Sequence, residues 1–191
     1  MMANTVMRIL LGVVILIVSV AAGYRWWEER QANALVDDGN AAIEAGNDFA
    51  AKAGKAFEEL FSESNLEGFP GNRDALRDRV NELAGELAKS AEQFRLAVTK
   101  FEEAESHNTD EKIKEYWGLK ASAVTKLAES KEAYRNAVLT YLDAGLTDRE
   151  ALIAKINAAM DAASKLGKEY DDMNEQADKV QKENASKFKS S

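Results

Sequence analysis

Apolar residues recur every three or four positions through most of this chain, which is the spacing of one face of an α-helix. The pattern is interrupted at three places, so it predicts four long helices after the N-terminal segment. Because the repeat is sustained over several heptads in each helix, we expect the helices to pack along shared seams. Their predicted spans are 25–64, 72–106, 110–144 and 148–184.

The interruptions contain residues that end or begin helices. Residues 68–71 read GFPG and separate the first predicted helix from the second, for which Asn72 is the expected N-cap. Gly145 is expected to end the third helix in the left-handed conformation. Thr109 and Thr147 are the expected N-caps of the third and fourth helices.

The segment 9–24 differs from the rest of the chain, because it reads ILLGVVILIVSVAAGY and carries no charge. A bilayer core of about 30 Å requires about 20 apolar residues in a helix, and this segment with its flanks approaches that length. We therefore predict a short N-terminal tail at 1–8 and a transmembrane anchor at 9–27. Residues suited to the membrane interface by charge or by an amphipathic ring flank it: Arg8, Tyr24, Arg25, Trp26 and Trp27.

The same segment also fits a secretory signal peptide. In that interpretation Arg8 supplies the charged region, 9–18 the apolar region and 20–22 the cleavage site. The flanking aromatic rings favour the uncleaved anchor. We expect a single-pass protein of the bacterial inner membrane, with its C-terminal part in the periplasm.

Small residues also lie along one face of the predicted anchor. Gly12, Ser19 and Gly23 are spaced seven and four residues apart. Small side chains at such spacing allow a second transmembrane helix to approach closely. This face is therefore a candidate packing surface.

The predicted connections between helices are short, so consecutive helices should run antiparallel. The fold class is all-α: a single transmembrane helix that continues into an elongated antiparallel up-down-up-down four-helix bundle. The bundle is expected over residues 28–184, followed by a polar, lysine-containing tail at 185–191. Helices of about 36 residues are about 54 Å long, so the bundle should be a rod.

The charge and composition narrow the function. A net charge of −8 argues against nucleic acid as a partner, because phosphate binding requires a basic surface. The chain has no cysteine and one histidine, His107, in a predicted loop. Zinc sites and ferritin-type di-iron sites require more ligands of these types. With no nucleophilic triad or phosphate-binding loop, we predict no enzymatic activity, no cofactor and no metal.

Two sets of residues are candidates for binding. Leu66 and Phe69 lie in a polar loop and are a candidate partner-docking surface, although Phe69 would instead plug the end of the bundle if it folded inward. Lys120 and Lys131 interrupt the heptads of the third helix. They either line an internal ligand site or extend along the edge of the seam.

These features favour a non-enzymatic, membrane-anchored scaffold or accessory subunit that binds other proteins at the membrane surface. Expected partners are membrane lipid and other membrane or periplasmic proteins, or a second copy of the chain. The alternative is an extracytoplasmic bundle that binds or senses a ligand. A filled bundle interior would favour the scaffold, and a polar cavity would favour the ligand-binding bundle.

Overall fold

A computed structural model describes the backbone of residues 2–108 and 110–188 and, within these ranges, the side chains from Arg30 onward. Every regular element in these ranges is a helix, so the all-α prediction is confirmed for them. The elements are α1 (Met2–Leu60), α2 (Glu63–Glu67), α3 (Arg73–His107), α4 (Glu111–Thr140), α5 (Arg149–Glu183) and α6 (Ala185–Phe188).

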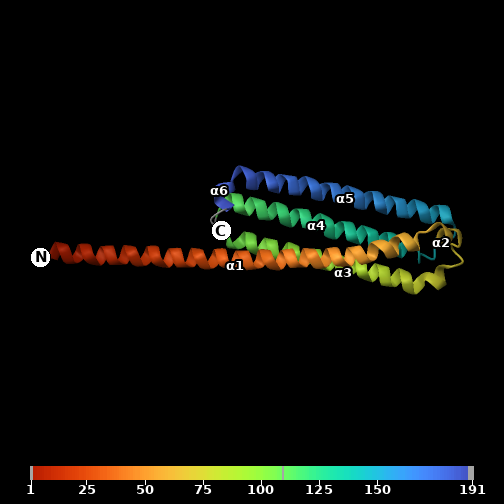
Figure 1. Cartoon of the computed structure of the whole chain (residues 1–191), viewed down its shortest axis with the longest axis horizontal. Coiled ribbons are helices and arrows are strands. Elements are labelled where there is room, and N and C mark those ends of the chain that lie inside the picture. Colours follow the sequence, from red (N-terminus) through yellow and green to blue (C-terminus); the bar gives the residue numbers. More distant parts are fainter. Residues whose placement is uncertain (1, 109, 189–191) are drawn as a thin grey trace.

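The four long helices lie side by side as a bundle, and consecutive long helices run in opposite directions (Figure 1). α1 packs on α3, α3 on α4, and α4 on α5. α2 and the α4–α5 connection lie at one end of the bundle, which we call the α2 end. The α3–α4 connection and α6 lie at the opposite end, and α1 extends beyond them (Figure 1).

Tyr141 is the centre of the apolar cluster at the α2 end. Its side chain is fully buried, and its ring contacts those of Phe61 and Phe69 at centroid distances of 6.2 and 5.3 Å. Its hydroxyl oxygen lies 2.9 Å from the side-chain oxygen of Asn72 and 2.9 Å from the carbonyl oxygen of Asn65. One residue thus joins the α2 segment to the ends of α3 and α4.

Two glycines of α1 allow a close approach to α3. A Cβ atom on Gly39 would lie 2.5 Å from Cε1 of Phe101, and one on Gly46 would lie 2.9 Å from Cε1 of Phe94. The two glycines and the two phenylalanines are each one heptad apart, so the rings pack directly against bare backbone. The buried Ser90 hydroxyl donates a hydrogen bond of 2.7 Å to the carbonyl of Gly46 across this interface.

Some predicted helix ends are wrong by a few residues. α1 ends at Leu60, and the residues expected to extend it to 64 instead turn into α2. α4 ends at Thr140 rather than 144, because the amides of Tyr141 and Asp143 donate to carbonyls three residues earlier and tighten the chain. Gly145 does not adopt the left-handed conformation, and its amide donates instead to the Asp143 carboxylate at 2.9 Å.

The N-cap predictions are wrong at α5 and outside the described residues at α4. Asp148, not Thr147, precedes α5, and its carboxylate accepts a 2.8 Å hydrogen bond from the amide of Ala151. At α4 the cap is Asp110, whereas the predicted cap, Thr109, lies outside the described residues. A carboxylate also complements the positive end of the helix dipole, which the hydroxyl of a threonine does not.

The substitution Asp148→Ala should lower the free energy of unfolding by about 1 kcal/mol. In a chain of this size we expect a fall in Tm of about 2–4 °C in thermal denaturation followed by circular dichroism. Thr147→Ala is the matched control and should change stability by less than about 0.5 kcal/mol. A larger loss for Thr147→Ala than for Asp148→Ala would contradict this cap.

The C-terminal region is more ordered than the predicted polar tail. Residues 185–188 form α6, and the ammonium of Lys187 lies 2.9 Å from a carboxylate oxygen of Asp110. The ring of Phe188 lies 5.2 Å from that of Tyr116 on α4. The described part of the tail is therefore packed on the start of α4.

Candidate functional site

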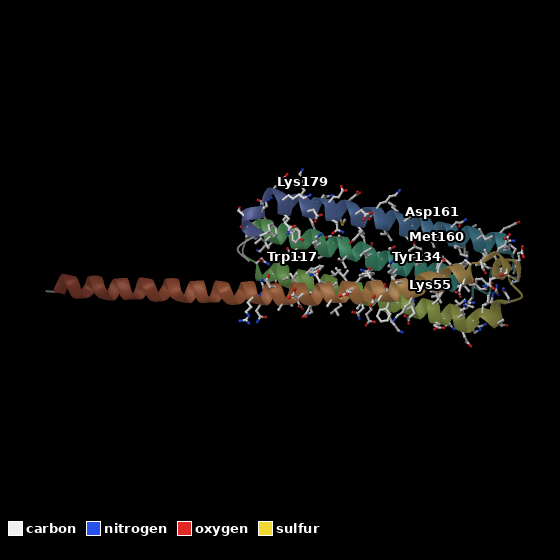
Figure 2. The ribbon with its side chains drawn as sticks, in the orientation of Figure 1. Lys55, Trp117, Tyr134, Met160, Asp161 and Lys179 are labelled. Atoms are coloured by element: carbon white, nitrogen blue, oxygen red, sulfur yellow. The ribbon has the colours of Figure 1, made fainter. Side chains whose placement is uncertain are left out.

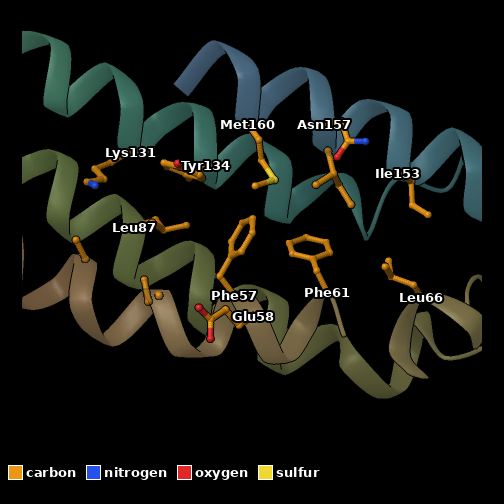
Figure 3. Close-up of a pocket in the computed structure, with 14 residues that line it drawn as sticks. Phe57, Glu58, Phe61, Leu66, Leu87, Lys131, Tyr134, Ile153, Asn157 and Met160 are labelled. Carbon is orange, nitrogen blue, oxygen red and sulfur yellow. The ribbon is translucent and has the colours of Figure 1, made fainter. Parts of the chain in front are cut away.

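A groove lies between α1 and α5 in the half of the bundle nearest α2 (Figure 3). In an up-down-up-down bundle these first and last helices are the pair that would close the fourth side. Within the described residues they do not pack closely on each other, although each packs on its neighbour in sequence. The groove has a volume of about 700 Å³, which is within the range of about 300–1,000 Å³ for small-molecule sites.

Aromatic rings from α1, from the turn that follows it and from α4 form one wall of the groove. The rings of Phe57 and Phe61 are 4.6 Å apart, and the ring of Tyr134 meets Phe57 edge-on at 5.8 Å. All three side chains are half-buried and line the groove. This wall offers flat apolar surface with little freedom to rearrange, since each ring is held by another.

The groove stays open because the residues of α1 that face α5 are small. Ala50 and Gly54 line the groove before the aromatic pair, and a Cβ on Gly54 would meet nothing within 4 Å. Opposite them, α5 contributes Ile153 and Met160. Met160 is 39% exposed and lies beside Tyr134 in the bundle (Figure 2).

Lys131 places a positive charge at one end of this apolar groove (Figure 3). Its side chain is half-buried, and burial lowers the pKa of its ammonium group. The ammonium lies 5.8 Å from the centroid of the Tyr134 ring. It makes no hydrogen bond or ion pair with another residue of the described chain.

Lys120, on the same helix, has a different environment. Its ammonium lies 3.0 Å from the side-chain oxygen of Asn174 and 3.3 Å from a carboxylate oxygen of Asp178, both on α5. It also lies 5.5 Å from the centroid of the Tyr116 ring. Of the two lysines that interrupt the heptads, one bridges α4 to α5 and the other lines the groove.

The remaining polar side chains of the groove lie at its rim. Glu58 is exposed on α1, and Figure 3 shows it well apart from Lys131. Asn157 is exposed on α5. In the part of the chain that the structure describes, no three His, Cys, Asp or Glu side chains are grouped so that they could hold a metal ion.

Leu66 and Phe69, the predicted docking loop, pack in the same apolar cluster but differ in burial. Phe69 is buried with its ring against Tyr141. Its prediction as an exposed docking residue is therefore wrong, and it follows the alternative in which it folds inward and closes the end of the bundle. Its inward position buries an aromatic ring that would otherwise face water. Leu66 is half-buried and lines the α2 end of the groove.

The predicted anchor residues lie outside the residues whose side chains are described. This applies to the interface set and to the small-residue set: Arg8, Tyr24, Arg25, Trp26 and Trp27, with Gly12, Ser19 and Gly23. Where the structure does describe the chain, no helical stretch reaches the length and apolar character needed to cross a membrane. His107 is half-buried at the end of α3.

Most groove residues were not identified from the sequence. Phe57 and Ala50 fit the heptads of the first helix, so the pattern predicts them as core. Lys131 carried a usable signal, because a charge at a seam position marks an incompletely covered face. Comparisons of this chain with protein-family models, with curated proteins and with solved structures gave no match.

Proposed function

We propose that this chain is a non-enzymatic, membrane-anchored helical module that binds a ligand in the groove between α1 and α5. The open seam between these helices is the observation that carries the proposal. A closed bundle would cover Phe57, Tyr134 and Met160, whereas here they line a volume suited to a small molecule. The groove is mainly apolar with Lys131 at one end, rather than the polar cavity expected from the sequence, and it supports the ligand-binding alternative through its open apolar lining.

The anchor completes the proposed module. α1 is one uninterrupted helix from Met2 to Leu60, so the apolar segment 9–24 and the groove wall belong to the same element. If 9–27 spans the bacterial inner membrane, the rod would hold the groove away from the lipid surface, in the periplasm. Retention of the intact chain in alkali-washed membranes would support this anchor, and release of a chain cut near 20–22 would support the signal peptide instead.

Filling the groove should abolish ligand binding. We expect the uncharged apolar dye Nile red to show saturable fluorescence enhancement with the full chain in lipid nanodiscs. Gly54→Trp places a large ring in the groove without a backbone clash. This substitution should weaken the saturable binding of the dye at least about tenfold. Dye dissolved in the nanodisc lipid gives the same fluorescence with every variant, so this signal does not affect the comparison between variants.

The matched control is Gly85→Trp, because Gly85 on α3 also has nothing within 4 Å of an added Cβ but does not line the groove. It should bind the dye like the unmodified chain. Equal dye binding by Gly54→Trp and the unmodified chain would contradict a binding role for the groove.

A protein scaffold is the second candidate, supported by the small-residue face of the predicted anchor. Gly12→Leu combined with Gly23→Leu should then weaken association with itself or with a second membrane protein. Association measured in nanodiscs that is unchanged by both substitutions would remove this support.

A further inference from the structure

At one end of the groove, Lys131 carries a positive charge that no negatively charged side chain of the described residues neutralises. Lys131 lies at the end farther from α2, and Leu66 lies at the α2 end (Figure 3). The described residues provide no carboxylate partner for the Lys131 ammonium, in contrast to Lys120 with Asp178. A half-buried cation without an anion is costly, so an anionic group placed beside it would be stabilised.

The surface between these two ends is mainly hydrocarbon, with Glu58 and Asn157 exposed at its rim. Phe57 on α1 and Phe61, just beyond its end, face Ile153 and Met160 on α5 along the length of the groove (Figure 3). The floor of the groove thus has one cationic end and one long, mainly apolar stretch, and its other polar side chains lie at the rim. This arrangement complements a molecule with a single anionic head and a single hydrocarbon chain.

The groove runs along several turns of its helical wall, which suits an extended chain. From Ala50 to Phe61, the α1 wall of the groove is about 16 Å long. A hydrocarbon chain lying along this wall would extend from Lys131 toward Leu66 (Figure 3).

We propose that the groove binds a free medium-chain fatty acid, with its carboxylate at Lys131 and its hydrocarbon chain extending over Phe57 and Phe61 toward Leu66. This inference rests on the proposed function, because it names the ligand class of the same groove. A carboxylate carries one charge and so matches the single lysine. Hydrogen bonds to charged groups are among the stronger ones, which gives the head group a measurable share of the affinity.

Displacement of Nile red from the full chain in nanodiscs tests the ligand class. The competitors are dodecanoate and dodecanol, which share the same hydrocarbon chain. Dodecanoate should displace the dye at a concentration at least about tenfold lower than dodecanol does. Lys131→Met should remove this preference, since it keeps an apolar stem and loses the charge, and Lys131→Arg should retain it.

Lys120→Met is the matched control and should leave the preference unchanged, because Lys120 lies outside the groove. Equal competition by dodecanol and dodecanoate, or a preference that survives Lys131→Met, would overturn the fatty-acid assignment. If Gly54→Trp still weakens the saturable binding of Nile red in that case, the groove remains a binding site and only the proposed ligand class is wrong. If Gly54→Trp has no effect on dye or dodecanoate, the proposed function itself fails.

Two further measurements distinguish a fatty acid from other occupants of the groove, namely a phospholipid and a second copy of the chain. Dodecylphosphocholine should compete less well than dodecanoate, and equal competition would assign the groove to phospholipid head groups and overturn the proposal. Sedimentation of the nanodisc complexes should show no self-association that depends on Gly54. Self-association that Gly54→Trp abolishes would assign the groove to a second copy of the chain.

Discussion

Replacement of Tyr141 by alanine should lower the free energy of unfolding by about 3–5 kcal/mol. The side chain is fully buried, and its ring holds Phe61 and Phe69 together at the α2 end. Its removal leaves a cavity among groups from α2, α3 and α4, which are connected by loops and cannot all collapse onto it. Thermal and denaturant unfolding followed by circular dichroism measures the loss.

Tyr141→Phe separates the ring from the hydroxyl. It keeps the packing and removes the hydrogen bond to Asn72, so we expect a loss of about 1–2 kcal/mol. Tyr170→Ala is a matched control, because Tyr170 is half-buried on α5 and should cost less. A loss for Tyr141→Ala no larger than that for Tyr170→Ala would show that the α2 end is not organised around Tyr141.

Gly46→Leu should have the second large effect, with a loss of about 3 kcal/mol. An added Cβ would lie 2.9 Å from the Phe94 ring, and this ring is itself fully buried and cannot move aside. α1 would have to separate from α3, which would also break the hydrogen bond from Ser90 to the Gly46 carbonyl. The same unfolding measurements apply.

Gly85→Leu is the corresponding substitution at a glycine with open space around it. Leucine is the better helix former by about 0.5–1 kcal/mol, so this variant should be slightly more stable than the unmodified chain. The two substitutions should therefore have opposite signs. Similar losses for both would contradict the close approach of α1 to α3.

The helices were predictable because each repeats its apolar positions over many turns. Leu152, Ile156 and Ala163 recur at heptad spacing and are buried in α5. Ser90 also keeps the heptad spacing, and its hydroxyl is satisfied by a carbonyl of the facing helix rather than by solvent. Local capping was predicted less well, because Thr147 and Asp148 are both suitable caps and the geometry of the preceding turn selects between them.

The groove could not be predicted from periodicity. The heptad pattern marks Phe57 as inward-facing, and it does face inward, toward Tyr134. Whether α5 covers it depends on the distance between the first and last helices, which are far apart in the sequence. That distance reflects side-chain sizes at Ala50, Gly54 and Met160 together. Lys131 was the local indication, because charged residues are rarely retained at a fully covered position.

Methyl NMR of the full chain labelled at its methionines tests the central claim most directly. Met160 lines the groove, whereas Met173 is on the same helix outside it. On titration with dodecanoate, the Met160 methyl signal should shift saturably and the Met173 signal should stay in place. In Gly54→Trp the shift of Met160 should disappear. If both signals move together, or if Met160 does not respond, the groove between α1 and α5 is not a ligand site.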